Sequence, residues 1–224
     1  MTSSSSSSKA TAIALRGATL RFGAHLIWEN LDLDVTPGEC LVILGPNGSG
    51  KTTLLKVFLG LLPLSAGTIT VDGRRPGLPR TRASQVDPAI EAVGAAGYAD
   101  APVGLLSGGQ QQRLRIAQAL VGMPRLLLCD EPLTSLDPAA QEEIVGVIDR
   151  HRREHGTTVV YVTHEITPVA DVVDQVLYVA AGRWAAGPAY TVLTTQTLSN
   201  LYGTHIDVLR VGGHVVIVGE GHGH

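Results

Sequence analysis

This chain has few cysteines and no long apolar run. Cys40 and Cys129 are the only cysteines among 224 residues, and each lies inside a short apolar run. A thiol in such a run behaves as a small buried hydrophobe, so no structural disulfide is expected and a reducing cytoplasm fits. No stretch approaches the roughly 18 consecutive apolar residues of a membrane helix, which predicts a chain that does not span a bilayer.

An excess of positive charge is also missing. The formal net charge is -3, which gives no sequence-wide field that would attract nucleic acid, so no nucleic-acid partner is predicted. Residues 1–10 contain an uninterrupted serine run and lack the apolar centre of a signal peptide. We expect them to form a disordered tail outside the folded domain.

Apolar runs separated by turn residues organise the rest of the chain. Residues 11–44 alternate apolar and polar positions, which predicts an antiparallel β-lobe leading into a buried strand at 40–44. Further strands are expected at 68–71, 125–129, 157–162 and 176–181, and helices at 52–62, 87–96, 108–121 and 138–153. Strands that alternate with helices indicate an α/β domain with a mostly parallel sheet.

A glycine-rich segment follows the strand at 40–44. It satisfies the pattern G-x-x-x-x-G-K-[ST] between a predicted strand and a predicted helix, which is the context that this motif requires. Its backbone N–H groups can surround phosphate oxygens, while Lys51 reaches the β- and γ-phosphates and Thr52 ligates Mg²⁺. A glycine-rich loop without function is the alternative. The residues expected to bind nucleotide here are Gly45, Pro46, Asn47, Gly48, Ser49, Gly50, Lys51, Thr52 and Thr53.

Two carboxylates end the apolar run at 126–129. Asp130 is expected at the carboxyl edge of a parallel sheet, where ligands of α/β proteins bind, and it can hold Mg²⁺. Glu131 is placed to orient or deprotonate an attacking water, a step worth roughly 10² to 10⁴ in rate. Without the glycine-rich loop, the same pair would more often be a solvated turn.

The segment Leu106-Ser107-Gly108-Gly109-Gln110 resembles the signature of the ABC ATPase family. A serine hydroxyl and two glycines at a helix start form a second anion site, although a plain helix cap is the alternative. The resemblance implies that Ser107, Gly108, Gly109 and Gln110 close over the γ-phosphate of a nucleotide bound to the opposite subunit. It therefore implies a homodimer through the ATP sites.

Other positions resemble the same family over residues 11–182. Residues 135–137 resemble the loop that crosses the dimer interface, which assigns Asp137 to the nucleotide site. His164 resembles the switch histidine that contacts the γ-phosphate, and it joins Lys51 and Glu131 in the implied catalytic set. Phe22 matches the aromatic residue on which adenine stacks, although it could equally be a core residue.

The resemblance implies a P-loop NTPase core in residues 11–196. It also implies hydrolysis of ATP with Mg²⁺, driving solute transport through a separate membrane permease at the inner face of the plasma membrane. A solute-binding protein is expected in the same system. The extension 197–224 is similar to that of zinc- and manganese-type ABC ATPases, which suggests a metal ion as cargo. Its histidines do not form a zinc-ligand pattern; they are His205, His214, His222 and His224.

The chain departs from the family between its two main motifs. Lys51 and Ser107 are only 56 positions apart, so the helical lobe, about 83–122, is predicted to be shortened. No strand ending in glutamine precedes it, and Gln85 is the only candidate for the family's Q-loop, which contacts Mg²⁺ and transmits closure to the permease. The alternative function is therefore an ABC subunit that binds nucleotide but hydrolyses poorly or is uncoupled. A GTPase is set aside because none of the lysines, Lys9, Lys51 and Lys56, lies in a guanine motif.

Overall fold

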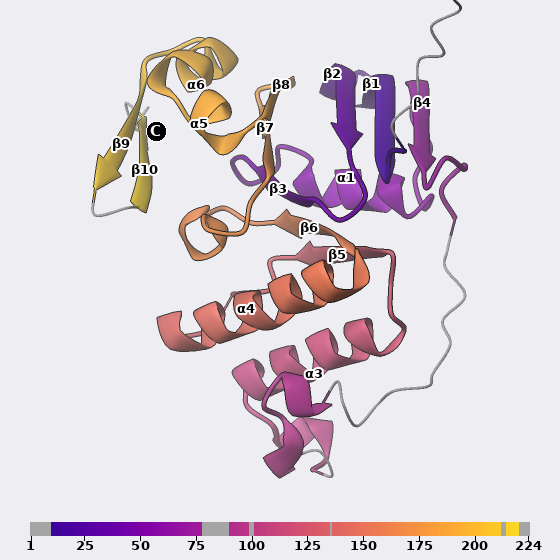
Figure 1. The fold of residues 1–224 in the computed structure, drawn as a ribbon. Coiled ribbons are helices and arrows are strands. Elements are labelled where there is room, and N and C mark those ends of the chain that lie inside the picture. Colours follow the sequence, from indigo (N-terminus) through magenta and orange to yellow (C-terminus); the bar gives the residue numbers. More distant parts are fainter. Residues whose placement is uncertain (1–9, 78–89, 99–100, 135, 212–213, 220–224) are drawn as a thin grey trace, which may run out of the picture.

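A five-stranded sheet forms the centre of the molecule (Figure 1). In the computed structural model, residues 10–77, 90–98, 101–134, 136–211 and 214–219 are described. The strand order is β5-β6-β3-β7-β8, so β5 lies at one edge among the described strands. The strands are β3 (Cys40–Leu44), β5 (Leu126–Asp130), β6 (Thr158–Val162), β7 (Gln175–Ala180) and β8 (Arg183–Gly187). All pairs are parallel except β7 with β8, which confirms the predicted sheet.

The centre of this sheet is apolar on both faces. Every residue of β3 and of β6 is buried, as expected of strands covered on both sides. Cys40, Val42 and Leu44 of β3 belong to one hydrophobic cluster, whereas Leu41 and Ile43 belong to the other. Burial raises the thiol pKa of Cys40 and of Cys129 to about 12, and both thiols are free.

A second sheet forms the N-terminal lobe. It has the order β2-β1-β4, from β1 (Ile13–Phe22), β2 (His25–Val35) and β4 (Ala66–Val71). Both pairs are antiparallel, so the predicted β-lobe is confirmed, and β4 begins two residues before its predicted start. Apolar residues of β1 and β2 share the cluster that contains Leu41 and Ile43, which attaches this lobe to the central sheet.

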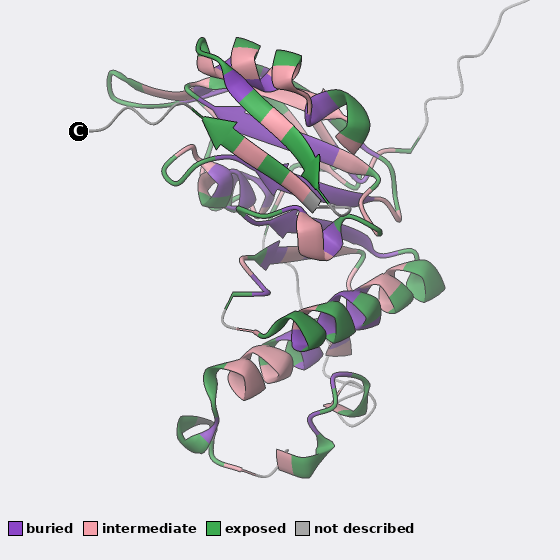
Figure 2. Cartoon of the chain, turned by 90° about the vertical axis from the view of Figure 1, so that its left-hand side faces the viewer, coloured by how far each residue is buried: buried purple, intermediate pink, exposed green. Residues whose placement is uncertain are grey.

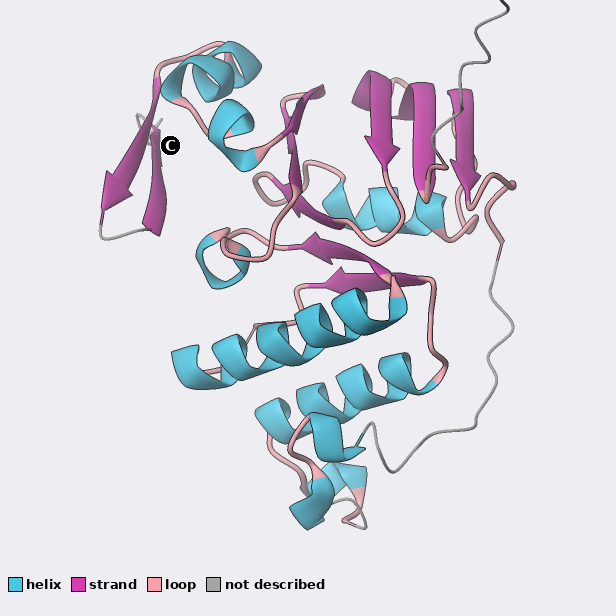
Figure 3. Cartoon of the chain, in the orientation of Figure 1, coloured by secondary structure: helices cyan, strands magenta, loops and turns pink. Residues whose placement is uncertain are grey.

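Helices pack beside the sheets as the sequence predicted, with differences at their ends (Figure 3). The helix α1 (Lys51–Phe58) is shorter than predicted, because Gly60 adopts φ 71° and the Leu61 N–H donates to the Lys56 carbonyl, closing the last turn. The helix α3 (Gly108–Val121) has its predicted bounds. The helix α4 (Pro138–His155) runs two residues further than predicted and ends at Gly156, whose φ is 66°.

The predicted helix at 87–96 is only partly seen, because residues 87–89 lie outside the described part. Residues 90–92 are helical, but Gly94 turns the chain with φ 66°, so the prediction is wrong beyond residue 92. Short 3₁₀ turns follow at η1 (Ala96–Tyr98) and η2 (Val103–Leu105), and η3 (Thr167–Val169) lies after β6. Gln85 and residues 1–9 also lie outside the described part.

The C-terminal segment forms two short helices and a hairpin. These are α5 (Ala189–Val192), α6 (Thr195–Tyr202), β9 (Ile206–Val211) and β10 (His214–Gly219). The strands β9 and β10 form an antiparallel pair. No helix within the described residues is long and apolar enough to cross a membrane.

Candidate nucleotide site

Three loops meet at one edge of the central sheet. They follow β3, β6 and β5, which are neighbours in the parallel part of the sheet, so their carboxyl ends lie together. The glycine-rich loop follows β3, the two carboxylates follow β5, and Thr163 and His164 follow β6. This edge is where an open α/β sheet binds its ligand.

The glycine-rich loop is pressed against the N-terminal lobe. Gly50 is the N-cap of α1 and has φ 95°, a left-handed conformation that favours glycine. A Cβ atom added there would lie 2.4 Å from Ile27 Cγ2 and 3.2 Å from Trp28 Nε1. Both residues are on β2, and Trp28 is fully buried. Gly50 is therefore required both by its backbone angle and by the side chains behind it.

Lys51 lies folded inside this loop. It is only 7% exposed, and its Nζ donates to the carbonyl oxygens of Gly45 at 2.7 Å and Pro46 at 3.0 Å. Burial lowers the pKa of Lys51, while the negative charges of Glu131 and Asp130 act to raise it. The ammonium group thus lies in the loop, close to both acidic groups, where it can meet phosphate oxygens.

Thr52 and Asp130 are brought together from positions 78 residues apart. The Thr52 hydroxyl donates to Asp130 Oδ1 at 3.2 Å. These are the two residues that the sequence assigns to Mg²⁺, and oxygen ligands of this kind are what Mg²⁺ prefers. The donor set therefore fits the metal.

Glu131 and His164 form a second contact at this edge. His164 Nδ1 lies 3.1 Å from Glu131 Oε2. The backbone of Glu131 has φ 48°, uncommon for a non-glycine residue, and its N–H donates to the Val162 carbonyl at 2.9 Å. The turn directs the Glu131 side chain toward the end of β6, beside the loop that holds Lys51.

The signature residues form the cap of α3. Ser107 Oγ accepts from the Gln110 N–H at 3.3 Å, and Gln110 Oε1 accepts from the Ser107 N–H at 2.8 Å, a reciprocal capping box. Figure 1 shows α3 separated from α1 by β5, β6 and α4. Within one chain, Ser107, Gly108 and Gly109 are therefore not brought to the glycine-rich loop.

The remaining predicted site residues lie at the ends of other elements. Asp137 caps α4, with its carboxylate accepting from the Ala140 N–H at 3.0 Å. Phe22 is half exposed at the end of β1, paired across the hairpin with His25. Ser135 lies outside the described residues. Their assigned roles stay predictions.

Within the described residues, the C-terminal histidines do not form a set of metal ligands. His205 Nε2 lies 3.0 Å from Asp207 Oδ1. In the described part of the chain there is no group of three His, Cys, Asp or Glu side chains that could hold a metal ion. His222 and His224 fall beyond that part.

The sequence did not predict the side chains that hold the loops of the site in place. Ile27 and Trp28 press on Gly50 from a different sheet, and no short motif marks them. Gln141 Nε2 donates to the carbonyls of Leu133 and Leu136, each at 3.2 Å, and so holds the loop after Glu131. The one sequence feature that could have indicated this role is the position of Gln141 in the first turn of α4, from which its side chain can reach the loop before the helix.

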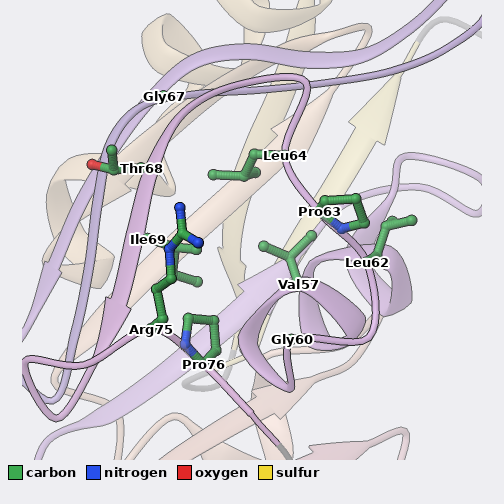
Figure 4. A pocket seen from close by; sticks show the side chains of 10 residues that line it. All are labelled: Val57, Gly60, Leu62, Pro63, Leu64, Gly67, Thr68, Ile69, Arg75 and Pro76. Atoms are coloured by element: carbon green, nitrogen blue, oxygen red, sulfur yellow. The ribbon is translucent and has the colours of Figure 1, made fainter.

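A separate hollow opens behind α1 (Figure 4). It has a volume of about 380 Å³ and lies between the C-terminal end of α1 and β4, with Val57, Ile69 and Arg75 among its walls. None of its lining residues belongs to the glycine-rich loop or to the ends of β5 and β6. The hollow is therefore distinct from the candidate site.

The fold and the glycine-rich loop define a P-loop NTPase. A family model described as ABC transporter matches residues 28–84 and 79–134, two segments that overlap at 79–84. The chain is 33% identical to an aliphatic sulfonates import ATP-binding protein of Xanthomonas axonopodis, over 86% of this chain and 80% of that protein. It is 32% identical to a zinc import ATP-binding protein of Pseudomonas fluorescens, over 90% of this chain and 86% of that protein.

A solved structure has the same fold. It is a metal-chelate type ABC transporter in an inward-facing conformation, with a TM-score of 0.76 and 22% identity over 94% of this chain and 98% of that one. The chain belongs to the ABC transporter family, as one of its ATP-binding subunits. The family predicted from the signature is thereby confirmed.

Proposed function

We propose that this chain hydrolyses ATP and thereby drives solute import through a separate membrane permease. The observation that carries the proposal is the 3.2 Å contact between Thr52 and Asp130, which joins the phosphate loop to the acidic strand end. The import direction rests on the relatives, which are named as import ATP-binding proteins. That likeness does not favour the alternative of an impaired or uncoupled subunit.

Thr52 and Asp130 would hold Mg²⁺ beside the β- and γ-phosphates. Held by these residues, Mg²⁺ would supply positive charge to offset the negative charge of the phosphate oxygens. Lys51 supplies the other cation, and it would exchange the carbonyls of Gly45 and Pro46 for phosphate oxygens. A charge-assisted bond to phosphate is stronger than a neutral one, which favours this exchange.

Glu131 is the proposed base. It would take a proton from the water whose oxygen attacks the γ-phosphorus. The bond between that phosphorus and the β–γ bridging oxygen would break, and this oxygen would keep the electron pair and depart as part of ADP. His164, 3.1 Å from the Glu131 carboxylate, would hold it in position and reach the γ-phosphate. Catalysis then rests on positioning and charge neutralisation.

A homodimer would complete the site. Because the signature cap of α3 lies away from its own phosphate loop, a second copy would supply Ser107 and Gly109 to each nucleotide, with Asp137 near the interface and Phe22 against the adenine. Residues 11–196 would form this ATP-binding domain. A permease and a solute-binding protein are the further partners, with the chain on the inner face of the plasma membrane.

The finer part of the proposal is a metal ion as cargo. It is supported by the C-terminal extension, in which α6 ends at Gly203 and the hairpin follows, and by a relative named for zinc import. A relative named for sulfonates has similar identity. Uptake of radioactive zinc, manganese and a sulfonate by cells carrying or lacking the gene separates these cargoes. Loss of sulfonate uptake alone would overturn the metal assignment.

Glu131→Gln tests the ATPase proposal. Phosphate release should slow by at least about 10²-fold, because an amide cannot accept the proton, while binding of a fluorescent ATP analogue is retained. Glu142→Gln, an exposed change on α4, is the matched control and should keep its turnover. Equal rates in the two variants would show that Glu131 is not the base.

A further inference from the structure

Gln141 lies between the proposed base and the first turn of α4. Its amide Nε2 donates to two backbone carbonyls of the loop that follows Glu131, those of Leu133 and Leu136, each at 3.2 Å. Its side chain also lines a hollow of about 220 Å³ whose walls include Glu131 and His164. Gln141 therefore contacts both the loop and the hollow in which the proposed base stands.

The backbone hydrogen bonds within this loop are long. The Thr134 N–H donates to the Glu131 carbonyl at 3.3 Å, and the Leu136 N–H donates to the Leu133 carbonyl, also at 3.3 Å. Both distances lie just beyond the range of about 2.7–3.2 Å that is usual for such bonds. Gln141 thus adds two hydrogen bonds to a loop whose own turns are held weakly.

The backbone of Glu131 needs support on its C-terminal side. On its N-terminal side the chain is fixed, because the Glu131 N–H donates to the Val162 carbonyl at 2.9 Å. Its φ of 48° is uncommon for a residue with a side chain and persists only where the surroundings hold it. A shift of the loop would rotate the peptide that follows Glu131 and redirect its carboxylate, which lies 3.1 Å from His164 Nδ1. The position of this carboxylate therefore depends on what holds the loop.

The helix on which Gln141 lies is well anchored. Buried residues recur along one side of α4 (Figure 2). Near the other end of the helix, Arg152 Nη1 donates to the Gly38 carbonyl and to Asp174 Oδ2, each at 2.8 Å. A side chain on a rigid helix holds its partner more precisely than a side chain on a loop. Gln141 therefore ties the loop after Glu131 to a fixed part of the fold.

We propose that Gln141 is a positioning residue for ATP hydrolysis. By clamping the loop to α4, it holds the Glu131 carboxylate where that group can take a proton from the attacking water. The proposal rests on the proposed function, in which Glu131 is the base. Gln141 acts through the loop, because its Nε2 is engaged by the two carbonyls. Its loss should therefore slow the chemical step and leave ATP binding by the phosphate loop in place.

Gln141→Met removes the N–H donor and keeps an unbranched side chain of similar length. We expect kcat for ATP to fall by roughly 10- to 10²-fold, while KM and the affinity for a fluorescent ATP analogue change by less than about twofold. Gln141→Arg restores N–H donors at this position and should recover part of the loss. Gln118→Met, at an exposed glutamine of α3, is the matched control and should keep the parent rate. A Gln141→Met variant at the parent rate, or a Gln141→Arg variant that is no faster than Gln141→Met, would overturn the proposal.

A double variant separates action through Glu131 from a general loss of structure. Once Glu131→Gln has removed the base, adding Gln141→Met should slow phosphate release by less than about a further twofold, because residues that act as one unit have non-additive effects. If the two losses multiply instead, Gln141 does not act through Glu131 and the proposal is wrong. Full turnover of Glu131→Gln alone would refute the proposed base itself, so failure of the proposed function is distinguished from failure of the role of Gln141.

Discussion

Gly50→Ala probes the contact between the phosphate loop and the N-terminal lobe. The left-handed backbone at φ 95° makes any side chain cost about 1–2 kcal/mol. The added Cβ would also lie 2.4 Å from Ile27 Cγ2, so β2 must move, and overpacking of this kind costs about 1–3 kcal/mol more. We expect the free energy of unfolding to fall by about 2–5 kcal/mol in total.

Gly48→Ala is the matched control in the same loop. Gly48 has φ 80°, but an added Cβ there would have no atom within 4 Å, so only the backbone cost of about 1–2 kcal/mol applies. Urea unfolding followed by circular dichroism gives both values, with equal m-values required for the comparison. If the two variants unfold at the same urea concentration, Ile27 and Trp28 do not support the loop in the way described.

Three further predictions concern the site and its neighbouring helices. Lys51→Ala should weaken ATP binding by roughly 10- to 10²-fold, since the loop loses its charge-assisted bonds; unchanged affinity for a fluorescent ATP analogue would remove the phosphate-site assignment. Asp130→Asn should raise the Mg²⁺ concentration needed for half-maximal phosphate release, and an unaltered Mg²⁺ titration would count against Asp130 as a ligand. Arg113→Met should lower the free energy of unfolding by about 1–3 kcal/mol, because Arg113 donates to the Val93 carbonyl at 3.0 Å and pairs with Glu143 at 2.8 Å. The hydrogen bond from Arg113 lowers the pKa of Glu143. The stability that comes from this pair is therefore present above the unfolded pKa of about 4.3 and is lost as the pH falls through the lower folded pKa. The difference in the free energy of unfolding between variant and parent should narrow below about pH 4 in acid unfolding curves, and a constant difference would refute the pairing.

Strands β3, β5, β6 and β7 of the central sheet could be predicted because their apolar runs are short, continuous and bounded by turn residues. Strand β8, which begins at Arg183 and has no such run, was not predicted. The starts of α3 and α4 were equally readable, since Ser107 and Asp137 have side chains that cap a helix. The meeting of Thr52 with Asp130 followed from the rule that parallel strands end at one edge, together with the family resemblance. These features are encoded over a few neighbouring residues.

Other features could not be predicted from local sequence. The apolar pattern continues through Leu61 and Leu62, but Gly60 and its backbone angle end α1 before them. Gly94 similarly stops the helix that had been extended to residue 96. The contact of Ile27 with Gly50 joins two sheets, and such a contact depends on how the lobes pack rather than on the pattern of either segment.

The edge position of β5 determines how its carboxylates are held. Among the described strands, β5 is hydrogen-bonded to β6 alone, and the Glu131 N–H continues that ladder to Val162. His164 follows the same strand β6, so Asp130, Glu131 and His164 all follow two neighbouring strands of the sheet. A strand with a single ladder opens at lower free energy than one with two. We therefore expect a displacement of the loop at His164 to move Glu131, whose carboxylate lies 3.1 Å from His164 Nδ1, since no described strand lies on the outer side of β5 to resist it.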